Sequence, residues 1–196
     1  MQVNVREIEG NWDGGYSLDK HTLTSVYIGD DEYGHPRFDT TRTEAGEAVY
    51  QLKYDDGWDR AEDLAEAIAE YIWPLLPEIG LIVPMPASTV RPRQPVTEVA
   101  HALGKLVKTP VFDELLFKRP GGPKLKDLKT KAEKLEALQG RIYYKDRIAG
   151  EDSWNVLLLD DLYDTGATAE VACDVLRTYE KIDGIYVAAL TRKGKR

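Results

Sequence analysis

The sequence predicts an α/β fold in which a mainly parallel sheet is flanked by helices. Short apolar runs at residues 79–83, 156–159 and 185–190 have the length and composition of buried strands. Segments with apolar residues at helical spacing alternate with these runs. Strands that alternate with helices favour a parallel sheet, whose ligands bind beyond the carboxyl ends of the strands.

The first 55 residues follow a different pattern and predict an antiparallel β cap. They are rich in Gly, Thr, Tyr and Asp, and alternating stretches at 24–28 and 48–54 are separated by turn-forming residues such as DDEYGHP. We therefore expect a β cap over residues 1–55 and an α/β core over residues 56–196. The aromatic residues of the cap either pack on the sheet or line a base-binding pocket: Trp12, Tyr16, Tyr27 and Tyr33.

The core is predicted to begin with two helices around a buried strand. Leu64, Ile68 and Ile72 recur every four residues until Pro74, which indicates an amphipathic helix that the proline ends. The strand at 79–83 stops at Pro84. The apolar stripe of the second helix consists of Val96, Ala100, Leu103 and Val107, and a further strand is expected at Val111 and Phe112.

The second half of the core contains a basic segment, two strands and another helix. Residues 118–138 are rich in lysine and indicate a loop that leads into a basic helix. The strand at 156–159 is followed by a polar turn and by a helix with Val171, Val175 and Tyr179 on one face. A strand at 185–190 completes the pattern.

Composition narrows the possible partners and the compartment. A net charge of −8 makes nucleic acid an unfavourable direct partner. No apolar run is long enough to cross a bilayer and the first residues lack the pattern of a secretory signal, so we expect a cytoplasmic protein without a membrane partner. Cys173 is the only cysteine, which excludes internal disulfides and indicates a packed core thiol.

The segment 156–169, VLLLDDLYDTGATA, contains the most specific chemistry. A buried strand places Asp160 and Asp161 at the sheet edge, where adjacent carboxylates can accept hydrogen bonds from a ribose diol or hold a hydrated magnesium ion. The next residues form a turn into a helix, whose free backbone amides are suited to bind phosphate. These turn residues are Asp164, Thr165, Gly166, Ala167 and Thr168. The alternative is that Asp164 or Thr165 only caps the helix and that the acid pair is solvated.

This segment resembles the phosphoribosyl pyrophosphate signature of the type I phosphoribosyltransferases. The resemblance implies a type I phosphoribosyltransferase-like sheet, in which Asp160 and Asp161 are catalytic and face the ribose hydroxyls and magnesium. It also implies that residues 164–168 hold the 5-phosphate of the ribose.

Over roughly residues 48–192 the chain is also similar to the ComF family. The segments KYDDGWDRAEDLAEAI, IVPMPASTVRPR and LKTKAEKLEALQGRI have the order and spacing of that family. The similarity implies that residues 118–131 form a hood over the reacting centre. It also implies a pyrophosphate site formed by Pro84, Met85, Pro86, Ala87, Ser88, Lys53, Arg91 and Arg93. ComF proteins commonly begin with cysteine-rich zinc ribbons, but the first 47 residues here contain no cysteine, so no structural zinc is expected.

We therefore expect a magnesium-dependent phosphoribosyltransferase that binds phosphoribosyl pyrophosphate or a related nucleotide and displaces pyrophosphate at C1 of the ribose. Three alternatives stay open. They are a non-catalytic regulator that binds the same ligand, an accessory of competence and DNA uptake, and a nucleotide-depleting defence effector. The acceptor leaves no signature in the sequence, and a homo-oligomer is compatible with it.

Overall fold

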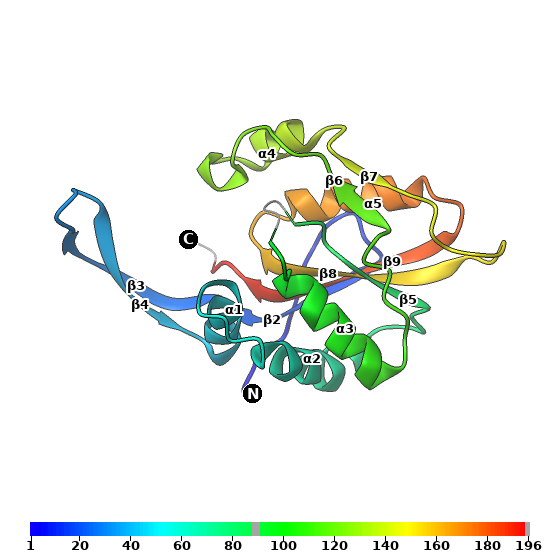
Figure 1. The fold of residues 1–196 in the computed structure, drawn as a ribbon, viewed down its shortest axis with the longest axis horizontal. Coiled ribbons are helices and arrows are strands. Elements are labelled where there is room, and N and C mark those ends of the chain that lie inside the picture. The colour runs from blue at the N-terminus through cyan, green and yellow to red at the C-terminus, as the bar shows by residue number, and fades with distance from the viewer. Residues whose placement is uncertain (88–90, 195–196) are drawn as a thin grey trace.

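The central sheet has five strands in the order β1-β2-β9-β8-β5 (Figure 1). The computed structural model describes residues 1–87 and 91–194. The strands are β1 (Arg6–Glu7), β2 (Gly14–Lys20), β5 (Leu81–Pro84), β8 (Trp154–Tyr163) and β9 (Ile182–Arg192). Strands β2, β9, β8 and β5 are parallel to one another, and β1 runs antiparallel to β2 at one edge. The mainly parallel sheet predicted from the sequence is therefore confirmed.

Helices cover both faces of this sheet. On one face lie α1 (Glu44–Tyr54), α2 (Arg60–Tyr71) and α3 (Pro95–Val107), and on the other lie α4 (Lys131–Leu138) and α5 (Ala167–Arg177). Single turns of 3-10 helix occur at Trp73–Leu75 and Leu125–Asp127. The helices predicted around Leu64 and around Ala100 are confirmed as α2 and α3.

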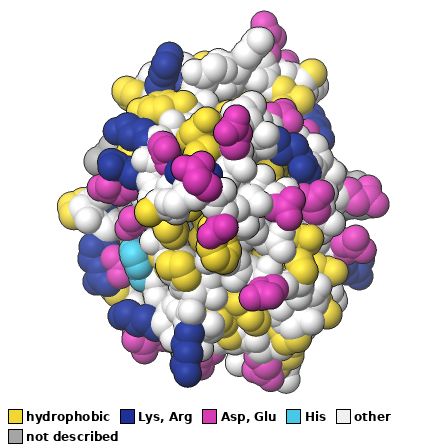
Figure 2. Space-filling model, turned by 90° about the vertical axis from the view of Figure 1, so that its right-hand side faces the viewer, with side chains coloured by type: hydrophobic (Ala, Val, Ile, Leu, Met, Phe, Trp, Pro, Cys, Tyr) yellow, Lys and Arg dark blue, Asp and Glu magenta, His cyan; other side chains and the backbone are white. Residues whose placement is uncertain are grey.

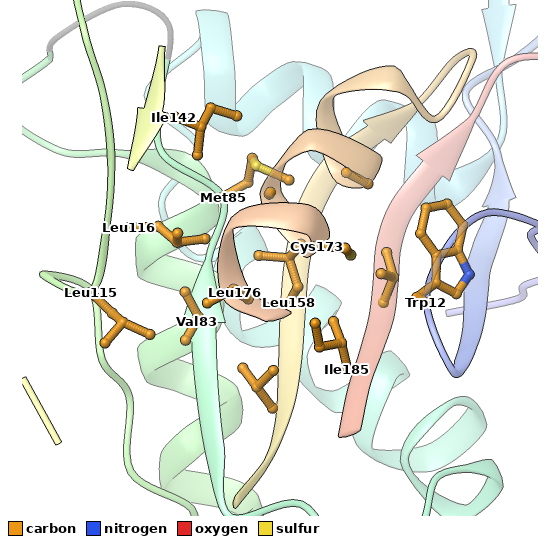
Figure 3. Close-up of a cluster of buried hydrophobic side chains, with 14 of the residues drawn as sticks. Trp12, Val83, Met85, Leu115, Leu116, Ile142, Leu158, Cys173, Leu176 and Ile185 are labelled. Carbon is orange, nitrogen blue, oxygen red and sulfur yellow. The ribbon is translucent and has the colours of Figure 1, made fainter. Parts of the chain in front are cut away.

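Strand β8 divides the hydrophobic core into two clusters. Val156 and Leu158 point toward α5, while Leu157 and Leu159 point toward the three helices of the opposite face. Alternation of this kind follows from the two-residue repeat of a strand. Figure 3 shows the α5 cluster, in which Cys173 packs near Leu158. Burial raises the pKa of this thiol to about 12, so Cys173 is the core residue that the sequence predicts.

Two antiparallel pairs extend from the core. Strands β3 (Thr22–Asp30) and β4 (Pro36–Arg42) form a long hairpin that projects from the body of the molecule (Figure 1), and we call residues 22–42 the arm. Strands β6 (Leu116–Lys118) and β7 (Ile142–Tyr144) flank the hood and α4. The antiparallel pairing expected near residues 24–28 is confirmed.

Two local predictions are wrong. The stretch 48–54 belongs to helix α1, because Thr43 caps the helix by accepting a hydrogen bond from Gly46 N at 2.9 Å and the buried residues recur at helical spacing. These buried residues are Ala45, Ala48, Val49 and Leu52. At Val111, a single bridge to Ile82 replaces the expected strand.

Among the described residues, no helix combines the length and the hydrophobicity that spanning a lipid bilayer requires. The molecular face turned away from the arm carries acidic side chains scattered among basic and apolar ones (Figure 2).

Candidate active site

The acid pair lies within strand β8, at its carboxyl end. The strand continues through Asp160 and Asp161 to Tyr163, because its pairing with β9 extends as far as Arg192. The two side chains therefore point to opposite faces of the sheet. Asp160 shares the face of Leu158 and α5, and Asp161 shares the face of Leu159 and α1. This arrangement gives the two carboxylates different neighbours.

Asp161 is paired with a cation from helix α1. Its carboxylate forms an ion pair with Lys53, and both side chains are largely buried. Arg91 donates a hydrogen bond to the backbone oxygen of Lys53 at 2.8 Å. The hydroxyl of Thr191 donates to the backbone oxygen of Asp161 at 2.9 Å. These contacts fix the strand end and gather two cationic side chains beside it.

Burial dominates the electrostatics of Asp160. Burial and, after it, the adjacent negative charge of Asp161 raise its pKa to about 7, although the hydrogen bond from Asp161 N and the positive charges of Lys53 and Lys118 oppose the rise. Its carboxylate accepts a hydrogen bond from Asp161 N at 2.8 Å. Lys118 lies close enough to favour the charged form of Asp160. Burial and the positive charge of Arg141 lower the pKa of Lys118 itself.

The turn after β8 has an anion-binding character. Lys134 of α4 lies 2.5 Å and Lys193 lies 3.1 Å from Oδ2 of Asp164. Burial opposes the ionisation of Asp164, but hydrogen bonds from these two ammonium groups lower its pKa overall. A cavity of about 180 Å³ lies against this turn, lined by Lys134, Lys193 and residues 164–169.

Gly166 allows the turn to enter helix α5. Its φ of +79° lies in the left-handed region that favours glycine. A Cβ at this position would lie 3.0 Å from Cε2 of Tyr163, which is closer than side-chain atoms ordinarily approach. The first amides of α5 have no acceptor within the helix, so they are available to an anion in the cavity.

A second cavity of about 310 Å³ adjoins the first. The two share Asp160, Leu162 and Thr168, so Asp160 stands at their junction, and Asp161 lines the second cavity. Its lining contains Lys53, Arg91, Asp161 and the loop residues Met85, Pro86 and Ala87. Another cavity, of about 560 Å³, lies between α1 and α2, away from the acid pair. Its many carboxylates, including Glu47 and Glu66, make it unfavourable for an anion.

Solved structures match this architecture, although no family model and no curated protein matches the sequence. The structure of the allosteric regulatory enzyme of purine biosynthesis superposes with a TM-score of 0.50 at 14% identity, over 82% of this chain and 34% of that one. Orotate phosphoribosyltransferase from Aeropyrum pernix superposes with a TM-score of 0.43 at 14% identity, over 89% of this chain and 77% of that one. UMP synthase from Leishmania donovani superposes with a TM-score of 0.37 at 14% identity, over 83% of this chain but only 27% of that one.

The chain shares the α/β fold of the allosteric regulatory enzyme of purine biosynthesis. At this level of identity the likeness shows the fold alone. Within it, the structure brings together at one strand end most of the residues that the sequence singles out. The acid pair, the turn 164–168, the loop 85–87, Lys53 and Arg91 all line the two adjoining cavities.

Two predicted residues, Pro84 and Arg93, do not line these cavities, and a third, Ser88, lies outside the described residues. Pro84 is the buried last residue of β5. Arg93 turns away, because its guanidinium forms two hydrogen bonds with Glu98, the shorter at 2.7 Å, and lies 4.2 Å from the ring centre of Trp58. The four aromatic residues of the cap were expected either to pack on the sheet or to line a base-binding pocket. Trp12 and Tyr16 pack on the core, whereas Tyr27 and Tyr33 are exposed on the arm.

Sequence analysis did not single out Lys118, Lys134 and Lys193 as ligands. Each lies in a basic stretch, but basic stretches are usually solvated surface and carry no positional signal. The side chain of Lys134 is only 10% exposed, and this burial distinguishes it from the surrounding lysines.

The acid pair is compatible with magnesium. The described residues hold no group of three or more His, Cys, Asp or Glu side chains that could bind a metal ion. Magnesium usually keeps several waters and takes only one or two carboxylates together with substrate phosphates. Asp160 and Asp161 could supply these two carboxylates.

Proposed function

We propose that this protein is a magnesium-dependent phosphoribosyltransferase that binds phosphoribosyl pyrophosphate. The supporting observation is the pair of adjoining cavities, each with its own cations, which meet at Asp160, while Asp161 lines the larger of the two. A ligand with a phosphate at one end, a diol in the middle and a pyrophosphate at the other end matches that order of groups.

The 5-phosphate is assigned to the cavity at the turn 164–168. Lys134 and Lys193 carry positive charge into it, and the start of α5 presents backbone amides to the same space. The small side chain of Ala167 and the hydroxyls of Thr165 and Thr168 suit the close approach of a tetrahedral anion.

The pyrophosphate is assigned to the second cavity, beside Lys53 and Arg91. The acceptor forms its bond to C1 of the ribose as the bond from C1 to the pyrophosphate oxygen breaks. Both electrons of that bond leave with pyrophosphate, and the proton of the acceptor passes to solvent. Lys53 and Arg91 stabilise the negative charge that develops on the leaving group. Magnesium held by the acid pair would neutralise further charge on the same group.

The hood segment completes the proposed site. Lys118 lies near Asp160, and α4 contacts the phosphate turn through Lys134. A cover over the reacting centre excludes water, which would otherwise hydrolyse the activated ribose. The order and spacing of the segments at 53–68, 82–93 and 128–142 support a ComF-like affiliation without a zinc ribbon, and the single buried thiol is in keeping with a reducing cytoplasm.

The test is release of pyrophosphate from phosphoribosyl pyrophosphate with magnesium and a panel of purine, pyrimidine and other nitrogenous acceptors. We expect one acceptor class to yield a ribosylated product together with pyrophosphate, and the yield to fall strongly in Asp161→Asn. If no acceptor and no hydrolysis consumes the ligand although it binds, the catalytic assignment is wrong.

That negative result would favour a second function, namely a non-catalytic regulator that binds phosphoribosyl pyrophosphate or a nucleotide. One observation supports it: Lys53 and Lys134 are both paired with carboxylates of the site itself. A ligand would have to reorganise these ion pairs, and such a rearrangement is a plausible basis for a ligand-dependent signal.

A further inference from the structure

The arm concentrates exposed apolar side chains on a thin projection. Of the twelve large hydrophobic side chains that are exposed among the described residues, six lie between residues 22 and 42. They are Leu23, Val26, Tyr27, Ile28, Tyr33 and Phe38. Twelve of the sixteen residues of β3 and β4 are exposed, and they lie on both faces of the hairpin. A concentration of exposed apolar side chains on one element often marks an interaction site.

Physical stability also argues that the arm has a partner. A two-stranded hairpin without a third layer is at best marginally stable in water. Besides the backbone ladder and the hydrogen bonds of the turn around Asp31, its side-chain contacts include the edge-to-face pair of Tyr27 and Phe38 at 5.9 Å. Ser25 and Thr40 also share a hydrogen bond at 3.1 Å. Both long edges of the pair also present backbone groups that could bind another strand.

The charges of the arm indicate which partner it suits. The tip carries Asp30, Asp31 and Glu32, and the base is flanked by Lys20 and by Arg42, which also pairs with Glu47 at 3.3 Å. Between tip and base the arm carries Arg37 and Asp39, whose charges are opposite. Two arms packed antiparallel about a twofold axis would place each acidic tip against the basic base of the other. The apolar middles would then cover one another. Parallel packing would instead bring six tip carboxylates together.

We propose that the arm is a self-association surface, through which two copies of this chain form an antiparallel dimer. A twofold contact of this type is isologous, because the same surface is used by both chains. Because neighbouring strand residues such as Val26 and Tyr27 point to opposite faces, one arm-to-arm contact would bury only the side chains of the facing side. The contact is therefore smaller than the ~800 Å² per partner of a standard interface. An anionic lipid surface or a nucleic acid fits poorly, since it would repel both the acidic tip and the net charge of −8.

The dimer would also reach the proposed site. The base of the arm is joined to the carboxyl edge of the sheet, where His21 N donates to Arg192 O at 2.8 Å and the His21 ring contacts the Thr191 hydroxyl at 3.2 Å. That hydroxyl donates to the backbone oxygen of Asp161. The tip of the partner's arm would therefore lie beside the strand edge that presents the acid pair.

The first experiment is sedimentation equilibrium of the full chain at micromolar concentration. We expect twice the chain mass of 22.1 kDa. Val26→Thr with Ile28→Thr keeps the β-branched shape but removes apolar surface, and should shift the equilibrium to monomer. The matched control, Leu75→Gln with Leu106→Gln, removes equally exposed leucines outside the arm and should leave the dimer intact.

The second experiment tests the antiparallel arrangement. Its expected result, a dimer that a second substitution restores, cannot arise from a variant whose arm has unfolded. Lys20→Glu and Glu32→Lys should each weaken the dimer by roughly threefold to tenfold, and the two together should restore it, because each pair occurs twice in a twofold dimer. A monomeric wild type overturns the proposal, and flotation of that monomer with anionic vesicles would assign the arm to a membrane instead. Unchanged dimerisation of the threonine variant, or failure of the double charge reversal to restore the dimer, also overturns it.

Discussion

The Nζ atom of Lys134 lies 2.5 Å from Oδ2 of Asp164, which joins helix α4 to the turn that begins helix α5. Thirty residues separate the two in the sequence. A second contact, from Lys131 to Glu170 at 2.6 Å, joins the same two helices. Helix α4, into which the hood leads, thus adjoins the turn to which we assign the 5-phosphate, and Lys134 is part of that anion site.

Removal of the Lys134 side chain should weaken binding of a phosphorylated ribose. Lys134→Met deletes one of two cations in the cavity and leaves Asp164 less neutralised, so affinity for ribose 5-phosphate should fall about tenfold. Isothermal titration calorimetry measures this directly. Lys129→Met is the matched control, because Lys129 is an exposed lysine of the preceding loop. Equal affinity in the two variants would contradict the assignment of Lys134.

Gly166 should be needed both for the left-handed backbone of the turn and for the close approach of Tyr163. Gly166→Ala places a Cβ 3.0 Å from Tyr163 in a backbone with φ of +79°, so the cost should exceed the ~1 kcal/mol typical of the left-handed conformation alone. Gly150→Ala is the control, since Gly150 has φ of +80° and nothing within 4 Å of the added atom. Urea unfolding compares the two free energies. Equal losses would show that the contact with Tyr163 is unimportant.

The two neighbouring arginines should differ in their effect on pyrophosphate. Arg91 lines the cavity beside Asp161, whereas Arg93 is bound to Glu98 outside it. Arg91→Ala should therefore reduce affinity for magnesium pyrophosphate about tenfold, while Arg93→Ala should leave it nearly unchanged. Competition with a fluorescent nucleotide provides the measurement. A larger loss in Arg93→Ala would reverse the two assignments.

Asp160 should make the stability of the protein depend on pH. Its folded pKa of about 7 lies above the usual value of 3.8, so between these values the folded protein binds more protons at this carboxyl than the unfolded chain does. The contribution of Asp160 to folding stability is present below pH 3.8 and is lost as the pH rises through about 7. Asp160→Asn removes this dependence and should become more stable relative to the wild type as pH increases. Denaturant titrations at several pH values test it, and parallel profiles of the two proteins would contradict the raised pKa.

The helix α1 shows why local pattern alone is insufficient. The stretch AVYQLKY at 48–54 can be described as alternating, but its start signal lies five residues earlier, at the capping Thr43. The buried residues Ala45, Ala48, Val49 and Leu52 also fit a helical repeat. The error matters for the site, because the helical conformation places Lys53 against Asp161.

The candidate site was predicted best where one continuous segment contains the chemistry. The strand, the acid pair and the turn of residues 156–169 are contiguous, so their order dictates their placement at the strand end. Lys134 and Lys193 come from distant segments and meet Asp164 only through packing of α4 and β9. The position of Arg93 also depends on packing, because its guanidinium forms an ion pair with Glu98, one turn into α3.

The central claim is that the acid pair and the adjoining turn hold a phosphorylated ribose together with magnesium. Calorimetric titration of phosphoribosyl pyrophosphate with magnesium tests it most directly, on the wild type and on Asp160→Asn with Asp161→Asn. We expect the wild type to bind and the double variant, folded as judged by circular dichroism, to lose most of the affinity. Unchanged binding in the double variant would contradict the account.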